Sequence, residues 1–285
     1  MFDTFRNRLE LTGVLTTVTA LRVSQGRSLK PIGSDLPVVQ DVLGNPLIPG
    51  SSFKGAMRSR LESFLRGIDP KRAIDPSELV NKDISERVKK LKETHKNNDK
   101  ALTAALIEMT DDVSKVFGSP WQAGKFQVQD LMVDLNEETR TWFGQYQERD
   151  GVSINRDTET AEDGRLYDFQ VVPAGTRFKF RAIVENAEEW ELGLLMIGLN
   201  QFEREQVPLG GGRSRGLGVV KLELTDQWWV DYDNPDELLT YLQRLVNNEI
   251  DEHYKLSPER FDAYKTDWTS ALIKYLTPTQ SLQEA

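Results

Sequence analysis

Residues 175–185 read GTRFKFRAIVE and form the most regular stretch of the chain. Apolar and cationic side chains alternate along it, with Phe178, Phe180, Ala182 and Val184 on one side and Arg177, Lys179 and Arg181 on the other. A period of two residues is typical of a strand that buries one face and exposes the other. The stretch therefore predicts a half-buried strand, and its neighbours can be placed around it.

Further strands and helices are predicted on both sides of this strand. On the C-terminal side, an amphipathic helix is expected at 187–204, followed by a glycine-rich loop and a strand at 217–224. On the N-terminal side, strands are expected at 8–20 and 125–135, with a short one at 38–40. Ser51 and Ser52 are candidate N-caps of a helix whose apolar face holds Phe53, Met57, Leu61, Phe64 and Leu65, with Gly67 as its stop.

Residues 67–116 differ in character and predict a helical insertion without a core of its own. Asp75 and Pro76 form a cap and a first-turn proline, and a charged helix follows to about Thr94. A second helix is expected from Asp99, with apolar residues at helical spacing as far as Val116.

The order of elements favours an α+β fold with an antiparallel sheet of the ferredoxin-like or RRM-like type. The expected domain covers residues 1–225 and includes the 67–116 insertion and a polar hairpin at 150–172. Residues 226–285 are expected to add an acidic extension with helices near 235–249 and 257–276. Sheets of this topology often bind single-stranded RNA.

The net charge of −9 over 285 residues is unusual for a nucleic-acid-binding protein, but the acid is unevenly spread. Residues 222–285 hold 13 Asp or Glu against 5 Lys or Arg, a net −8. Residues 1–66 hold 9 Lys or Arg against 5 Asp or Glu, a net +4. A basic face beside an acidic tail is compatible with phosphate contact, and an ordinary acidic protein is the alternative.

The residue types that are rare here exclude several kinds of chemistry. Cysteine is absent, which removes disulfides, thiolate catalysis and a cysteine-ligated zinc site, so no zinc is expected. With His95 and His253 as the two histidines, a serine–histidine triad or a multi-histidine metal centre is not expected either. The sequence has no membrane-spanning apolar run and no secretory signal pattern, so a cytoplasmic location is expected.

The glycine-rich loop Leu209–Gly218 is the first candidate for RNA contact. Glycines allow close backbone approach, consecutive amides of Gly211 and Gly212 can form an anion-binding nest, and Arg213 and Arg215 can hold phosphates. A strand follows it and no Gly-Lys-Ser/Thr ends it, so it matches neither a dinucleotide fingerprint nor a Walker loop. The alternative is a plain turn between a helix and a strand.

The stretch PLIPGSSFKGAMR at 46–58 is the second candidate. It leads into a helix N-terminus, where free amides at Ser51 and Ser52 and the helix dipole favour a phosphate. Lys54 and Arg58 are four residues apart and project from one side of that helix. A capped helix with two surface cations is the alternative.

Asp35 lies in GSDLPVVQD at 33–41 and is the candidate catalytic residue. A carboxylate beside bound RNA can hold a divalent cation or orient a 2′-hydroxyl for attack on the neighbouring phosphate. Capping of a turn is the alternative. The hairpin tip around Ile154 and Arg156 could wedge against nucleic acid or pack on a neighbouring subunit, and could also be a plain hairpin.

Taken together, these segments resemble the RAMP superfamily, and within it the backbone subunits of type III CRISPR effector complexes of the Csm/Cmr type and the Csx RAMP group. The resemblance covers roughly residues 5–225. Four segments match in order: GSDLPV with PGSSFKG and Arg58, then Phe117-Gly118-Ser119, then Ile154-Asn155-Arg156 with Thr158 and Ala161, and the glycine-rich loop 210–218.

The resemblance implies a subunit that lines a guide crRNA beside other RAMP subunits and a Cas10-type large subunit, and that meets target RNA. It implies guide phosphates on Ser51, Ser52, Lys54, Arg58 and the glycine-rich loop, with Ile154 and Arg156 on a thumb that interrupts the guide–target duplex. It also implies that Asp35 cleaves the target with Mg²⁺ or Mn²⁺ through 2′-hydroxyl attack, and that residues 67–116 form a lid.

Two departures and two alternatives accompany this resemblance. The histidine that some relatives carry at the end of the first strand is Arg22 here, and the segment after residue 225 lies outside the shared region. A non-catalytic structural RNA-binding subunit of the same complex is one alternative. A guide-processing ribonuclease is the other, but such enzymes usually rely on a histidine, and neither histidine lies in a matching segment.

Overall fold

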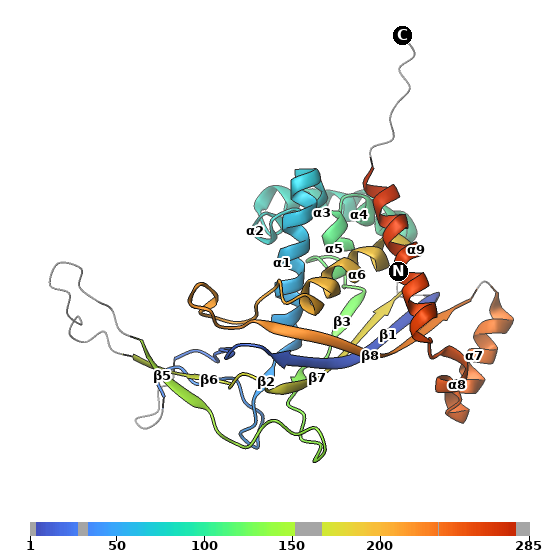
Figure 1. Ribbon diagram of the computed structural model, residues 1–285. Helices are drawn as coiled ribbons and strands as arrows, with labels where there is room; N and C mark the ends of the chain where they lie inside the picture. Colours follow the sequence, from blue (N-terminus) through green and yellow to red (C-terminus); the bar gives the residue numbers. More distant parts are fainter. Residues whose placement is uncertain (1–3, 28–33, 152–166, 233, 278–285) are drawn as a thin grey trace, which may run out of the picture.

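The computed structural model describes residues 4–27, 34–151, 167–232 and 234–277, and its centre is a four-stranded antiparallel sheet (Figure 1). Its strands stand in the order β3-β7-β1-β8. They span Asn7–Thr17 (β1), Phe126–Val128 (β3), Arg177–Glu185 (β7) and Val220–Asp231 (β8). With helix α1 (Gly50–Ile68) after β1 and helix α6 (Glu189–Glu203) after β7, the chain follows the β-α-β-β-α-β path of ferredoxin-like folds. The expected fold class is confirmed.

Strand β7 has the two faces that its sequence predicts. Phe178, Phe180, Ala182 and Val184 are buried at 2% exposure or less. Lys179 and Arg181 are exposed on the other face. The apolar row packs under the helices, where the Phe53 ring of α1 lies 5.1 Å from that of Phe180 and 4.3 Å from that of Phe202 in α6.

Helices α1 and α6 cover one face of the sheet, and helix α9 (Pro258–Leu276) packs against α6 (Figure 1). Helix α6 is buried on nearly all sides because it lies between the sheet and α9. Two glycines permit this close packing. A Cβ at Gly193 would lie 2.1 Å from the Trp268 carbonyl oxygen of α9, and one at Gly198 would lie 2.4 Å from Met57 of α1.

The helix predicted after Ser51 and Ser52 differs in detail from its prediction. Ser51 and Ser52 lie in the first turn of α1, and Pro49 occupies the N-cap position without a side-chain cap. Helix α1 also continues past Gly67 to Ile68, because Gly67 keeps a helical conformation and Asp69 takes the extended one.

The insertion is helical, as expected, and carries one break that the prediction lacked. It contains η1 (Pro70–Arg72), α2 (Pro76–Leu79), α3 (Lys82–Thr94), α4 (Asp99–Glu108) and α5 (Asp112–Phe117). The helix expected from Asp99 to Val116 is interrupted because Asp111 caps α5, its carboxylate accepting the Ser114 N–H at 2.9 Å. No residue of α3 or α4 is buried, so these two helices project from the body.

The strand expected at 125–135 is split between two sheets. β3 belongs to the main sheet, whereas β4 (Leu131–Met132) pairs with β2 (Leu47–Ile48). Asp130 lies between them and turns its carboxylate to the first amide of α1. The predicted short strand near 38–40 is reduced to single bridges, from Val38 to Ser24 and from Gln40 to Pro46.

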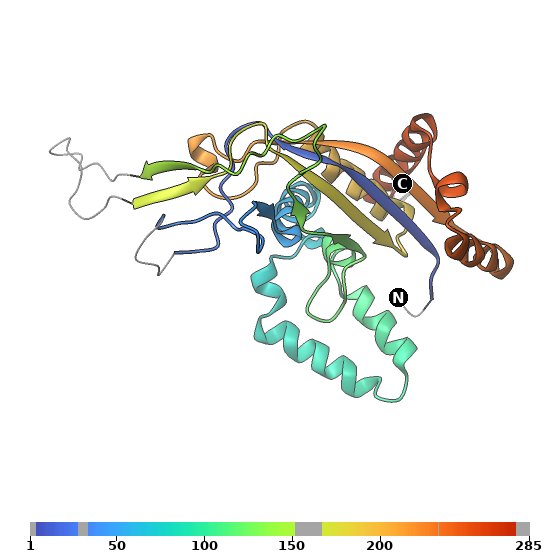
Figure 2. The ribbon, with the colours of Figure 1, turned by 90° about the horizontal axis from the view of Figure 1, so that it is seen from below.

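The polar hairpin is present as a stem that projects to one side of the sheet (Figure 2). Its strands are β5 (Gln147–Gly151) and β6 (Tyr167–Val171). The predicted contact residues Ile154 and Arg156 lie outside the described residues.

The last strand is longer than predicted, and helix α9 of the acidic extension packs on the main core. β8 runs from Val220 to Asp231, with a register shift opposite Thr12 and Gly13, so the expected boundary at 225 falls inside it. Helices α7 (Pro235–Asn247), α8 (Ile250–Tyr254) and α9 follow. Trp268, Leu272 and Leu276 of α9 join the main hydrophobic core, so α9 packs on its own chain. Within the described ranges, no helix is long and apolar enough to cross a membrane.

Candidate RNA interface

Three segments far apart in the sequence meet at one end of the sheet: the loop around Asp35, the stem strand β6 and the glycine-rich loop. Leu36 forms a parallel bridge with Phe169 of β6, and the Gln170 N–H donates to the Leu36 carbonyl oxygen at 3.1 Å. The Asp35 N–H donates to Oδ1 of Asp168 at 2.7 Å. The loop is thus fastened to the hairpin stem along three successive residues of β6.

A small apolar cluster, separate from the main core, lies beneath this end of the sheet. Ala20, Phe169, Val171 and Leu217 are buried in it, and Leu36 packs against it. These residues come from four parts of the fold, namely the segment after β1, the stem, the glycine-rich loop and the Asp35 loop. The cluster explains how one corner can hold several loops in place, because burying their apolar side chains together stabilises the arrangement.

The glycine-rich loop is anchored to the segment that follows β1 and presents its arginines to solvent. The Gly211 N–H donates to the Arg22 carbonyl oxygen at 2.8 Å, and η2 (Arg213–Arg215) follows with all three residues exposed. Arg215 donates to the Tyr167 hydroxyl at 3.3 Å, and the Arg22 guanidinium stands 4.5 Å above the Phe169 ring. Three guanidinium groups and the Asp35 carboxyl therefore belong to the same corner.

Most glycines of this loop satisfy demands of the fold itself. Gly218 has a φ of +85°, and a Cβ there would lie 2.0 Å from the Leu209 carbonyl oxygen. Gly211 differs, because its φ lies outside the left-handed region and the nearest atom to an added Cβ is 4.0 Å away. The fold therefore tolerates a side chain at Gly211, and the open space above its backbone is available to a ligand.

The second candidate, the N-terminus of α1, already holds an anion of this chain. The Gly50 N–H donates to the Asp130 carboxylate at 2.8 Å. A helix N-terminus favours negative charge, as the sequence predicts, and a carboxylate supplies it here. Ser51 is exposed and Ser52 half-buried beside this carboxylate.

Lys54 and Arg58 share one side of α1, and that side faces the connection between α5 and β3. Lys54 Nζ donates to the Phe126 carbonyl oxygen at 2.8 Å, and burial, with the nearby Arg58 charge, lowers the pKa of Lys54. Arg58 donates to Glu62, the Gly118 carbonyl and the Ser114 hydroxyl at 2.7 to 3.0 Å. Their contact with RNA stays a prediction, and these internal bonds count against it.

The described part of the acidic extension does not cover the corner around Asp35. In both views, α7 and α8 lie at the opposite end of the sheet from the glycine-rich loop and the hairpin stem (Figures 1 and 2). The excess acid is thus separated from Arg213 and Arg215, which keeps the corner compatible with a phosphate chain.

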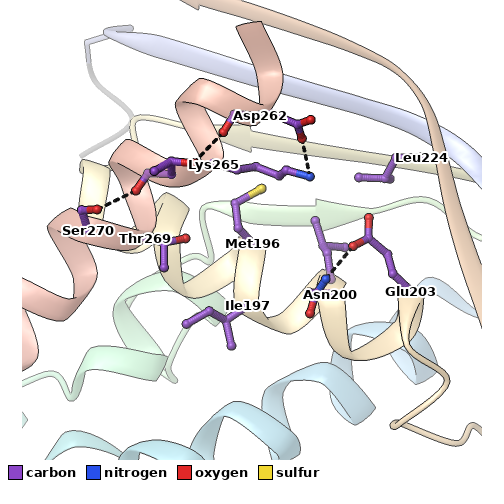
Figure 3. A pocket seen from close by; sticks show the side chains of 11 residues that line it. Met196, Ile197, Asn200, Glu203, Leu224, Asp262, Lys265, Thr269 and Ser270 are labelled. Atoms are coloured by element: carbon purple, nitrogen blue, oxygen red, sulfur yellow. Dashed lines mark hydrogen bonds and ion pairs between the residues drawn. The ribbon is translucent and has the colours of Figure 1, made fainter. Parts of the chain in front are cut away.

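A groove between α6, α9 and β8 lies elsewhere on the surface, and it lacks the exposed arginines of the corner (Figure 3). Met196 and Leu224 line it, and two pairs of its polar side chains bond to each other. Asp262 pairs with Lys265 at 2.9 Å, and Asn200 donates to Glu203 at 2.9 Å. The polar side chains of this groove therefore do not converge on a ligand.

The carboxyl groups described at the corner are too few to hold a metal ion without further ligands. Among the described residues there is no group of three or more histidine, aspartate or glutamate side chains able to hold a metal. Asp35 supplies a carboxyl group, and the Asp168 carboxylate lies beside its main-chain N–H. Mg²⁺ is commonly held by one or two carboxylates together with substrate phosphates and water, and this corner fits that kind of shared site.

The structure adds residues that the sequence did not single out as site residues. Asp168 and Tyr167 approach Asp35 and Arg215 across separations of 133 and 48 positions. The alternation of β6 could indicate which residues share a face, but it carries no information about the loop that would pack there.

Comparisons with known proteins agree with this geometry. The family model described as the RAMP superfamily matches residues 14–221. A protein from Methanocaldococcus jannaschii named CRISPR system Cms endoribonuclease Csm3 is 26% identical over 76% of this chain and 79% of its own length. A protein of the same name from Enterococcus italicus is 28% identical over 75% of this chain and 89% of its own.

A solved structure titled Type III-B Cmr-beta in the apo state shares the fold, with a TM-score of 0.50 and 15% identity. The alignment covers 76% of this chain and 97% of the other. The chain belongs to the RAMP superfamily. The resemblance to RAMP subunits of type III CRISPR systems, expected from its ordered motifs, is confirmed.

Proposed function

We propose that this chain is a backbone subunit of a type III CRISPR complex that holds crRNA and cleaves the target RNA paired with it. Family membership and relatives named endoribonuclease support the general role. The observation that carries the proposal is the position of Asp35, held at the corner between the glycine-rich loop and the hairpin stem. A target strand paired with a guide held by that loop would pass beside this carboxyl.

The sheet itself favours contact with the RNA backbone over contact with bases. RRM domains read bases by stacking them on aromatic side chains of the open sheet face. The outward positions of β1 carry no aromatic ring, and those of β7 hold Arg177, Lys179, Arg181, Ile183 and Glu185. Phosphate contacts position a strand without reading its sequence, which suits a subunit that must accept any guide.

The proposed reaction is attack of a target 2′-hydroxyl oxygen on the adjacent phosphorus. The new P–O2′ bond closes a 2′,3′-cyclic phosphate as the P–O5′ bond breaks, and the proton of the 2′-hydroxyl is balanced by the one taken up by the 5′-oxygen. Asp35 would orient the 2′-hydroxyl and, with the substrate phosphate, hold a divalent cation; Arg213 and Arg215 would hold phosphates. A bound Mg²⁺ or Mn²⁺ would neutralise charge on the phosphate oxygens.

Cleavage by the reconstituted complex tests the proposal. With guide, target and Mg²⁺ or Mn²⁺ present, Asp35→Ala should slow target cleavage by about 10²-fold or more while guide and target binding persist, because losing a positioned acid–base group costs this much. Asp150→Ala, on the exposed stem strand β5, is the matched control and should cut normally. A wild-type complex that binds the target and leaves it intact would support the non-catalytic structural role instead.

A further inference from the structure

Strand β6 contacts each of the segments at the corner through consecutive residues. The Tyr167 hydroxyl accepts from Arg215 of the glycine-rich loop, and the Phe169 ring lies under the Arg22 guanidinium at the end of β1. Between them, Asp168 accepts the main-chain N–H of Asp35. The hairpin stem is thus the element that fixes where Asp35 stands relative to the arginines.

The bond from Asp35 to Asp168 restrains the proposed catalytic residue directly. At 2.7 Å it is a short hydrogen bond to a carboxylate, and such charge-assisted bonds are about twice as strong as neutral ones. It fixes the plane of the peptide that carries the Asp35 side chain. The peptide between Leu36 and Pro37 is held by the Gln170 N–H on the Leu36 carbonyl oxygen, so two points of the loop are tied to one strand.

No other hydrogen bond of Asp35 restrains it within the described part of the chain. Among the described residues, no hydrogen bond or ion pair holds its carboxyl, which is half-buried and can face a ligand. The direction of that carboxyl therefore depends on its backbone, whose N–H is held by Asp168. A displacement of a reacting group by about 1 Å can cost about 10²-fold in rate.

We infer that Asp168 is a positioning residue for Asp35, which it holds in the cleaving orientation through the backbone without itself touching the reacting atoms. This inference rests on the proposed function. Positioning of Asp35 requires an oxygen acceptor on the side chain at position 168, and it does not require a negative charge there. An asparagine side chain supplies such an oxygen, so Asp168→Asn and Asp168→Ala separate positioning from a direct role in holding a cation.

The matched control is Asp150, which lies directly opposite Asp168 in the β5–β6 pairing and is exposed. Asp168→Ala should slow single-turnover cleavage by the assembled complex by about 10- to 100-fold, with target affinity unchanged. Asp168→Asn should restore most of the rate at an unchanged Mg²⁺ requirement, and Asp150→Ala should match wild type. An Asn variant as slow as the Ala variant, or an Ala variant as fast as wild type, overturns the inference.

Hydrogen exchange in the isolated full chain gives a readout that does not depend on cleavage. The Asp35 amide should lose protection in Asp168→Ala and keep it in Asp168→Asn and Asp150→Ala. Unchanged protection in Asp168→Ala would sink the inference even if Asp35 is catalytic. Conversely, normal cleavage by Asp35→Ala with the expected exchange pattern would refute the proposed function and leave the structural contact established.

Discussion

At the scale of single residues, the two halves of the predicted interface turn out to be different in kind. The glycine-rich loop presents exposed arginines, whereas Lys54 and Arg58 of α1 are bonded to their own chain. The motif Lys-x-x-x-Arg indicates that both cations lie on one side of a helix, and they do. Only the packing of the α5–β3 connection against that side decided what they contact.

We predict that Arg58→Ala destabilises the fold by about 1–3 kcal/mol, because it leaves the Gly118 carbonyl and a Ser114 hydroxyl without their donor. It also removes one of the two partners of Glu62, which is 5% exposed. Denaturant unfolding measures this loss. An Arg58→Ala protein of unchanged stability that no longer binds guide RNA would instead favour the phosphate role.

A pair of glycine substitutions separates fold from ligand contact in the loop. Gly211→Ala should leave stability within about 0.5 kcal/mol, because the site is open and its φ is ordinary, and should weaken guide RNA binding. Gly218→Ala should instead cost at least about 1 kcal/mol, since both its φ and its contact with Leu209 are incompatible with a Cβ. If Gly211→Ala binds guide RNA like wild type, close approach of a strand at this loop is excluded.

At the scale of elements, the contact between α6 and α9 shows how close helix packing depends on glycines, which have no side chain. Gly193 brings α6 against the backbone of α9, so that Trp268 sits 3% exposed between Trp229 and Tyr264. The near-complete burial of α6 follows from this contact. An amphipathic pattern predicts one buried face, and the second is covered by a helix from the acidic extension.

Two helix glycines make a matched test of this packing. Gly193→Ala should destabilise by about 1–3 kcal/mol, because the added methyl would overlap the Trp268 carbonyl and push α9 away. Gly55→Ala should stabilise by about 0.4–1 kcal/mol, because it lies on α1 with open space around it. Thermal unfolding of both variants checks the pair, and equal effects would contradict the close contact.

At the scale of the whole molecule, the segments flanking the central sheet contribute unequally to its stability. Helices α3 and α4 of the insertion have no buried residue, whereas α9 places four apolar side chains in the main core. The start of α6 is fastened further by the buried pair of Lys125 and Glu191, at 6% and 2% side-chain exposure. Burial raises the pKa of Glu191 despite the lysine beside it.

Deletions should reveal this inequality. Replacing residues 81–109 by a short glycine–serine linker should change the melting temperature little, because few apolar contacts are lost. Truncation after residue 256 should prevent stable folding, because removing α9 exposes apolar surface of α6 and β8 together. Circular dichroism and melting curves measure both. A truncated chain that melts like the full one would show α9 to be a separate module.

The sequence by itself determined the local and ordered features of this protein. Period-two alternation placed β7, helical spacing placed α1 and α6, and the order of elements predicted the sheet topology, because these patterns depend on neighbours close along the chain. The tertiary structure alone decided the break before α5, the split of 125–135 around Asp130, the length of β8 and the burial of Arg58. It also brought Asp168 to Asp35. Such outcomes depend on which distant segments compete for the same hydrogen-bond donors and the same core volume, and contacts of that kind leave no period in the sequence.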